Sequence, residues 1–112
     1  MMLISSLLQQ LNHLPEFERE RLLRAGIYEA AQARIHELRK EISECERHIR
    51  EFERRYGVSF SEFEEKILPE AHAFAIHDDY NDWYYWEEIL AEKKRLLEEL
   101  ERVEVVDAPG AK

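Results

Sequence analysis

The fold is decided by the stretch YEAAQARIHELRKEISECERHIREFERRY, which runs from Tyr28 to Tyr56. Its apolar residues follow one another in alternating steps of three and four, which is the spacing of a heptad seam. The seam residues are Tyr28, Ala31, Ile35, Leu38, Ile42, Cys45, Ile49, Phe52 and Tyr56. A helix of this length spans roughly 43 Å at about 1.5 Å per residue. We therefore expect a helical hairpin or an oligomer to cover the seam.

The composition of the whole chain agrees with a helical protein. Of its 112 residues, 45% are apolar and 37% are charged, while only three are Gly and three are Pro. So few turn-forming residues make an all-β or a doubly wound fold improbable. The sequence predicts an all-α fold with one helical domain over residues 1–106. Residues 107–112, which include Ala-Pro-Gly-Ala, are expected to form a disordered tail.

Two further segments precede the seam. An apolar stripe made of Leu3, Ile4, Leu7, Leu8 and Leu11 predicts a short amphipathic helix that ends near His13. Three helical turns are not stable alone, so we expect this helix to dock on the same protomer or on a second one. Pro15 is suited to the first turn of the next helix. The stripe changes phase near Gly26, so we expect a kink or a break there.

The turn after the seam carries strong local signals. Gly57 can supply the left-handed residue that ends a helix. Ser59 and Glu62 have the spacing of a capping box, which begins a new helix. The sequence predicts a short corner helix after Ser59 that is closed by Pro69.

The remaining chain predicts a second long helix. Glu70 to His77 has no clear period, and the sequence leaves open whether this stretch is helical or irregular. The polar residues from Asp78 to Asp82 are acceptable helix caps, and an apolar stripe follows as far as Val103, with Lys93 interrupting it. The expected architecture is an extended antiparallel helical hairpin, or coiled coil, with a short corner helix and an amino-terminal amphipathic helix.

The seam could be covered within the chain or between chains. In a parallel pair of copies Arg34 would face Arg39, whereas an antiparallel pair places Arg39 opposite Glu46. The competing partner is the chain's own second long helix, and closing that hairpin costs less entropy. Oligomeric state stays open at this point, with a homodimer as the preferred oligomer.

Charge is unevenly spread along the chain, whose formal net charge is −9. Residues 1–56 contain ten basic and ten acidic residues, while residues 57–112 contain six basic and fifteen acidic ones. This acidic half disfavours direct nucleic-acid binding and favours a basic protein partner. No apolar run is long enough to cross a bilayer, the first residues lack the features of a signal peptide, and Cys45 is the single cysteine. We expect a cytoplasmic protein without membrane contact.

No pattern of residues indicates catalysis or a cofactor. His72, His77, Asp78 and Asp79 could in principle bind a metal ion, but helical metal sites favour spacings of three or four. Cys45 and His48 have that spacing but lack a second pair. The chain has no Gly-rich phosphate loop and no nucleophile motif. We expect no enzyme activity, no metal and no cofactor, and a metal-binding helical protein ranks as the third functional alternative.

The strongest functional signal is the aromatic segment from Tyr80 to Trp86. Four consecutive aromatic residues on a helix point about 100° apart, so they cannot all face one core. One interpretation is that Trp83 and Trp86 cap the hairpin while Tyr84 and Tyr85 rest on the Phe60–Phe63 corner. The other is a partner-binding site, since Trp and Tyr dominate such sites. Its predicted residues are Tyr80, Trp83, Tyr84, Tyr85, Trp86, Asp78, Asp79, Asp82, Glu87 and Glu88.

The motifs Arg-Tyr-Gly at residues 55–57, Ser-Phe-Ser-Glu-Phe-Glu at 59–64 and Asp-Tyr-Asn-Asp-Trp-Tyr-Tyr-Trp-Glu at 79–87 carry a family resemblance. Over roughly Ala33 to Leu100 the chain resembles small acidic helical proteins that serve as antitoxin-like partners in prokaryotic toxin–antitoxin modules. The resemblance implies a protein that binds and neutralises a partner, often a nuclease, without catalysing a reaction. It departs from many antitoxins in having no clear DNA-binding motif. The alternative function is a homo-oligomeric coiled-coil scaffold.

Overall fold

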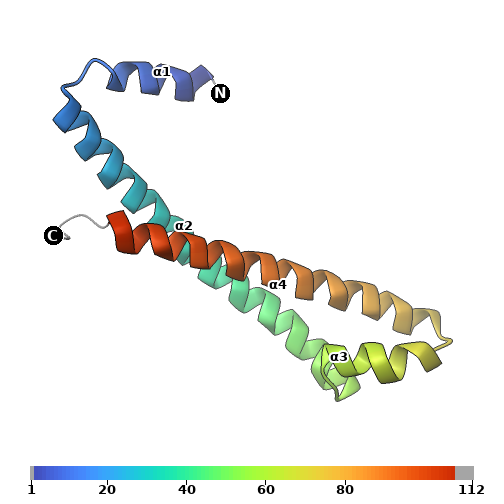
Figure 1. Ribbon diagram of the computed structural model, residues 1–112. Helices are drawn as coiled ribbons and strands as arrows, with labels where there is room; N and C mark the ends of the chain where they lie inside the picture. Colours follow the sequence, from blue (N-terminus) through green and yellow to red (C-terminus); the bar gives the residue numbers. More distant parts are fainter. Residues whose placement is uncertain (1, 108–112) are drawn as a thin grey trace. The chain divides into compact units, whose positions relative to one another are not determined.

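In a computed structural model that describes the backbone of residues 2–107 and the side chains of residues 3–103, the chain is helical throughout apart from short connections (Figure 1). The long helices are α2, Glu16–Tyr56, and α4, Phe74–Asp107, and a shorter helix α1 spans Met2–Leu11. Between α2 and α4 lie α3, Phe60–Glu62, the π-helical segment η1, Phe63–Ile67, and the 3-10 turn η2, Leu68–Glu70. The all-α fold class is confirmed.

The chain divides into two units, each described separately below. One contains Met1–Ile35 with Glu99–Lys112, and the other contains His36–Glu98. The predicted disordered tail lies outside the described residues except for Asp107, which is the last residue of α4.

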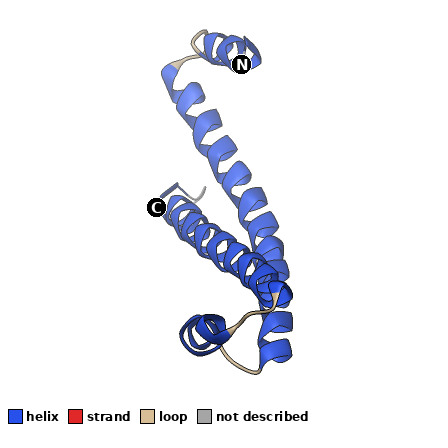
Figure 2. Cartoon of the chain, turned by 90° about the vertical axis from the view of Figure 1, so that its right-hand side faces the viewer, coloured by secondary structure: helices blue, strands red, loops and turns tan. Residues whose placement is uncertain are grey.

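The unit His36–Glu98 is an antiparallel hairpin of α2 and α4 (Figures 1 and 2). As the residue number increases along α2, the number of the contacting residue on α4 decreases. Lys93 Nζ lies 2.7 Å from Glu41 Oε1, the ring centroids of Trp86 and His48 are 4.0 Å apart, and Tyr56 donates a hydrogen bond of 2.5 Å to Asp79. The predicted hairpin is therefore confirmed.

Side chains of the seam lie along the inner side of α2. Leu38, Cys45, Ile49 and Phe52 are buried within the hairpin unit, and Ala31 and Ile35 are buried in the other unit. Tyr28, Ile42 and Tyr56 are half-buried. Lys93, which interrupts the apolar stripe of α4, points its ammonium group at Glu41 of α2. An ion pair thus occupies a position that the stripe would otherwise fill with an apolar side chain.

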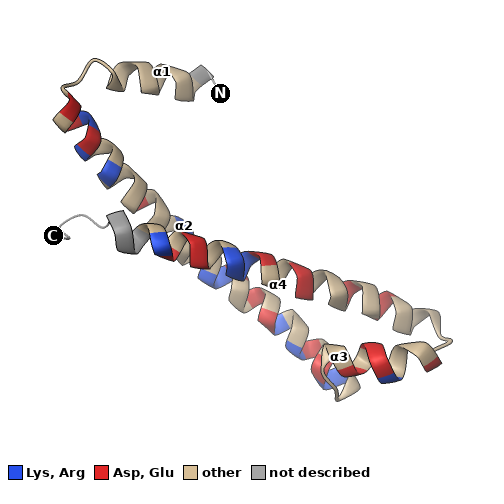
Figure 3. Ribbon diagram, viewed as in Figure 1, with Lys and Arg blue, Asp and Glu red and all other residues tan. Residues whose placement is uncertain are grey.

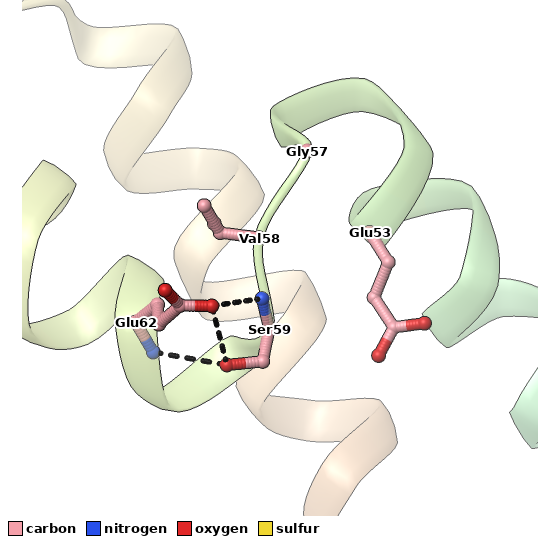
Figure 4. Close-up of a pocket in the computed structure, with 5 residues that line it drawn as sticks. All are labelled: Glu53, Gly57, Val58, Ser59 and Glu62. Carbon is pink, nitrogen blue, oxygen red and sulfur yellow. Dashed lines mark hydrogen bonds between the residues drawn. The ribbon is translucent and has the colours of Figure 1, made fainter.

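The corner between the helices forms as the sequence predicts. Gly57 has a φ of 71°, a left-handed conformation that residues with a Cβ rarely adopt. Ser59 then caps α3: its Oγ accepts a 3.2 Å hydrogen bond from the backbone N–H of Glu62, whose carboxylate faces the N–H of Ser59 at 3.4 Å (Figure 4). The capping box starts the corner helix directly after the end of α2. The chain turns back along α2 with α4, after the loop at residues 71–73 (Figure 1).

Three expectations about helix boundaries are wrong. Helix α2 continues without a break through Gly26, since one glycine costs only about 1 kcal/mol among good helix formers. Pro69 does not close the corner helix but lies inside η2, where an early position in a new turn needs no N–H group. The stretch Glu70 to His77, which the sequence left open, is a loop over residues 71–73 followed by helix. Helix α4 therefore begins at Phe74, and the expected caps Asp78 and Asp82 lie within it.

Candidate functional site

The predicted partner-binding residues all lie in the first four turns of α4, and the structure divides them into an inner and an outer set. Trp83 belongs to the inner set and is 0% exposed. Its ring centroid lies 5.5 Å from that of Phe52, 5.2 Å from that of Phe63 and 5.3 Å from that of Phe60. The indole N–H donates a 3.2 Å hydrogen bond to Glu87. Trp83 is thus the centre of the hairpin's core, and its ring is not offered to a partner.

Asp79 also belongs to the inner set. It accepts a 2.5 Å hydrogen bond from the Tyr56 hydroxyl and a 2.8 Å hydrogen bond from Arg55, both at the end of α2. Burial raises the pKa of Asp79, but the hydrogen bonds from Tyr56 and Arg55 and the charge of Arg55 outweigh it, so the net pKa lies below the usual value. Burial and the Asp79 hydrogen bond together raise the pKa of Tyr56 to about 12. This cluster ties α2 to α4 next to the corner.

The other inner residues make similar contacts across the hairpin. Tyr80 donates a 2.8 Å hydrogen bond to Glu64 of η1, and Trp86 stacks on His48 of α2 with the ring planes 7° apart. Burial raises the pKa of Glu87, although its hydrogen bond from Trp83 acts in the opposite direction. Aromatic and acidic side chains on this side of α4 therefore serve the packing of the hairpin.

The outer set is exposed and forms a continuous surface on α4. Tyr84 is 47% exposed and Tyr85 is 55% exposed, although the Tyr84 ring centroid is still 6.3 Å from that of Phe60. Asp78, Asp82 and Glu88 are exposed around them. We call this surface the acidic–aromatic face and define it as Phe74, Asp78, Asp82, Tyr84, Tyr85 and Glu88.

Phe74 was not among the residues predicted from sequence, yet it is 80% exposed. It precedes Asp78 by four residues and Tyr85 by eleven, so all three lie on one side of the helix. This spacing can be read from the sequence, but it places Phe74 beside Asp78 and Tyr85 only if the helix is known to begin at Phe74. The sequence suggests a later start, because Asp78 and Asp82 have the chemistry of helix caps.

Along the sequence, the charges on both sides of the acidic–aromatic face are of one sign, although Arg55 of α2 reaches Asp79 on the inner side of α4. Between Lys66 and Lys93 the chain has no Lys or Arg, while it has seven Asp or Glu residues. Figure 3 shows the corresponding part of α4 with acidic residues and no basic ones. A negative field over this stretch attracts positively charged groups and repels phosphates.

The corner also carries a shallow, open depression (Figure 4), whose lining residues are Glu53, Gly57, Val58, Ser59 and Glu62. Ser59 and Glu62 already bond to each other in the capping box. The depression is therefore a consequence of the turn, and its polar groups serve the turn.

Metal-ligating residues are not brought together in the part of the chain that the structure describes, where no group of three or more His, Cys, Asp or Glu residues is placed to hold an ion. His77 faces the backbone oxygen of Ala71 at 3.2 Å, and Asp79 is engaged with α2. Cys45 is 1% exposed, and burial raises the pKa of its thiol. Over residues 2–107, no helix combines the length and apolar character that a membrane span requires.

Comparisons with protein-family models, curated proteins and solved structures found no match for the chain.

Proposed function

We propose that this protein is a protein-binding module that holds a basic protein partner on the acidic–aromatic face of α4. The observation that carries the proposal is the exposure of three aromatic rings, those of Phe74, Tyr84 and Tyr85, among carboxylates that have no basic residue between them. Single exposed rings are ordinary on protein surfaces, but three within the first four turns of one acidic helix, with exposed carboxylates between them, are typical of an interface.

Rings and carboxylates would contribute to binding in different ways. The carboxylates of Asp78, Asp82 and Glu88 attract a positively charged surface over several ångströms and so act mainly on the association rate. The rings become buried only in the final complex, so they act mainly on the dissociation rate. A cationic side chain of the partner could also lie over a Tyr ring.

The resemblance to antitoxin-like proteins extends the proposal to biological role. In this role the protein neutralises its basic partner, for instance a nuclease, by occupying the surface that the partner uses for its own negatively charged ligand. Such a role needs no catalytic group on this chain. The acidic–aromatic face supports the role because it offers carboxylates where a nucleic acid would offer phosphates.

The first step of the test is to capture the partner from the source cells and to express the protein encoded beside this chain as the first candidate. Binding kinetics are then measured with single-ring and charge variants. Tyr84→Ala or Tyr85→Ala should weaken binding by roughly 1–3 kcal/mol through faster dissociation while the melting temperature stays nearly unchanged. Asp78→Lys combined with Asp82→Lys should slow association, and the effect should shrink at high salt.

A matched control separates the local field from the total charge. Glu65→Lys combined with Glu98→Lys changes the net charge by the same amount at exposed positions outside the face. This control should leave association much closer to that of the wild type. If both charge pairs slow association equally and neither Tyr variant speeds dissociation, the acidic–aromatic face is not the binding site.

A further inference from the structure

A second apolar surface lies in the amino-terminal part of the chain, and it is separate in sequence from the acidic–aromatic face. Of the thirteen large apolar side chains that are exposed among the described residues, nine fall between Leu3 and Ile27. Those on α1 are Leu3, Ile4, Leu7 and Leu8, and those on α2 are Phe17, Leu22, Leu23 and Ile27, with Leu14 between the helices. A concentration of this kind marks an interaction surface.

Helix α1 is too short to be stable without contacts to its apolar side. It has ten residues, which is shorter than the length at which an isolated helix is stable in water. Four residues of its apolar stripe are nevertheless exposed, with Leu3 the most open at 74%, and only Leu11 is half-buried. The predicted docking of this stripe on the same protomer is therefore not what the structure shows.

On α2 the exposed apolar residues alternate with charges of both signs. Phe17, Glu20, Leu23, Arg24 and Ile27 follow one another in steps of three, three, one and three, which places all five on one side of the helix. Each of them is exposed. This side of α2 is thus an apolar strip that carries one acidic and one basic residue at its centre.

We propose that a second copy of this chain covers this surface, through antiparallel pairing of the two α2 segments around Leu22. Residues at equal distances from Leu22 then face each other across the two-fold axis. Phe17 faces Ile27 of the second copy, Glu20 faces Arg24 of the second copy, and the two Leu23 side chains meet near the axis. Each of the first two contacts occurs twice, and α1 of each copy adds apolar area.

Charge and area both fit a second copy. Residues 1–35 contain four Arg and four Glu, so two copies of this segment do not repel each other, although the whole chain has a net charge of −9. Leu22 lies on the other side of α2 from this strip. The other eight apolar side chains offer roughly 60–120 Å² each, which is of the order of the 800 Å² that each partner of a stable complex buries.

A lipid surface fits less well than a second copy. Helices that lie on membranes carry Lys and Arg on their polar face. Helix α1 has no charged residue, and its polar positions are Ser and Gln. The inference does not rest on the proposed binding of a basic partner.

Sedimentation of the full-length protein across a concentration series tests the proposal. The wild type should be a dimer, and Leu23→Glu combined with Ile27→Glu should raise the dissociation constant at least about 100-fold. Both positions are exposed, so the circular dichroism spectrum of the variant should stay helical. As a matched control, Phe74→Glu combined with Leu96→Glu alters two exposed apolar residues elsewhere and should leave the dimer intact.

A charge exchange tests the antiparallel pairing without depending on stability. Glu20→Arg alone places two Arg residues face to face in each contact, and Arg24→Glu alone places two Glu residues there, so each variant should dimerise weakly. When the two variants are mixed, the facing pairs become Arg with Glu, and a heterodimer should form in preference to either homodimer. Interactions within each helix are the same before and after mixing, so only contact between copies can cause that preference.

A monomeric wild type would overturn the proposal, and it would do so in favour of a lipid surface if that monomer binds vesicles of phosphatidylcholine and phosphatidylserine. A dimer that survives Leu23→Glu with Ile27→Glu would overturn it as well. A mixture without preference for the heterodimer would exclude the pairing of Glu20 with Arg24 of the second copy.

Discussion

Neighbouring residues of the aromatic segment differ in burial: one belongs to the core, and the next is exposed. Trp83 is buried among the rings of Phe52, Phe60 and Phe63, while Tyr84, the next residue, is about half exposed. The difference follows from the turn of about 100° between successive helical residues. At this scale the polar contacts of Asp79 and Glu87 fix the orientation of the inner aromatic side chains.

Asp79 should make the stability of the hairpin sensitive to acid. Its folded-state pKa lies below its ordinary value, so the unfolded chain takes up the proton first as the pH falls. The stabilisation by Asp79 should be complete above about pH 5 and be lost as the pH falls through the folded-state pKa. Asp79→Asn should therefore lower the free energy of unfolding by about 1–2 kcal/mol at neutral pH, with a difference that vanishes in acid.

Urea denaturation at a series of pH values measures this difference. Asp78→Asn is the matched control, because Asp78 is the adjacent carboxylate and is exposed on the outer side of α4. The control should follow the wild-type profile. An Asp79→Asn protein whose stability falls with acid as steeply as that of the wild type would contradict the assigned role.

Among the elements, the corner between α2 and α3 shows how short sequence signals fix a long hairpin. The positive φ of Gly57 ends α2, and the reciprocal bonds of Ser59 and Glu62 start α3. The segments η1 and η2 then turn the chain into the loop before α4. No side chain lies within 4 Å of a Cβ built on Gly57, so the requirement for glycine there is one of backbone conformation.

The two glycines of the helical region should respond to alanine in opposite ways. Gly57→Ala forces a Cβ into the left-handed region and should cost about 1–2 kcal/mol of stability, and Gly57→Val should cost more. Gly26→Ala should instead raise stability by about 0.5–1 kcal/mol, because Gly26 lies within α2 with open space around it. Ser59→Ala should cost about 1 kcal/mol through loss of the cap.

Thermal and urea unfolding of these variants give the comparison, with Ser61→Ala as the control for Ser59→Ala. Ser61 is an exposed serine of the same helix that takes no part in the capping box. A corner in which Gly57→Ala and Gly26→Ala change stability in the same direction would not have the proposed dependence on φ.

Sequence alone predicted the parts of the fold that depend on local pattern. The heptad seam from Tyr28 to Tyr56 indicated the hairpin, and Gly57 with Ser59 indicated the corner. The start of α4 was misjudged because Asp78 and Asp82 have the chemistry of caps, whereas Ile76 and Tyr80 pack against the core and extend the helix past them.

The division of the candidate site into two sides was harder to foresee. Asp79 resembles its neighbour Asp78 in sequence, and only the fold brings it to Arg55 and Tyr56, more than twenty residues away. For Tyr84 and Tyr85 the sequence left two interpretations open, packing on the Phe60–Phe63 corner or exposure in a partner-binding site. Their exposure depends on which side of α4 meets α2. Phe74 was missed because its helix had not been predicted to reach it.

On the scale of the whole molecule, charge separates the two proposed surfaces. The segment with the exposed apolar residues, 3–27, belongs to a neutral stretch, whereas the acidic–aromatic face lies in a stretch without basic residues. A neutral apolar surface suits self-association, and an acidic one suits a basic partner. Under the two proposals, the two partners would contact different residues of the chain.

The two surfaces should be separable by mutation. Leu23→Glu with Ile27→Glu should abolish the dimer but leave the association rate with the basic partner, measured per protomer, nearly unchanged. Asp78→Lys with Asp82→Lys should slow that association and leave sedimentation unchanged. Measuring both properties for both variants completes the comparison, and a variant that changes both would show that the two surfaces are coupled.

Burial of Cys45 between the long helices has a practical consequence. The residue is 1% exposed, and burial disfavours the reactive thiolate. A thiol reagent can reach this sulfur only when α2 and α4 move apart, and the sequence contains no second cysteine to react in its place. The rate at which Cys45 reacts with a thiol reagent therefore reports how often the hairpin opens, and this measurement needs no substitution in the chain.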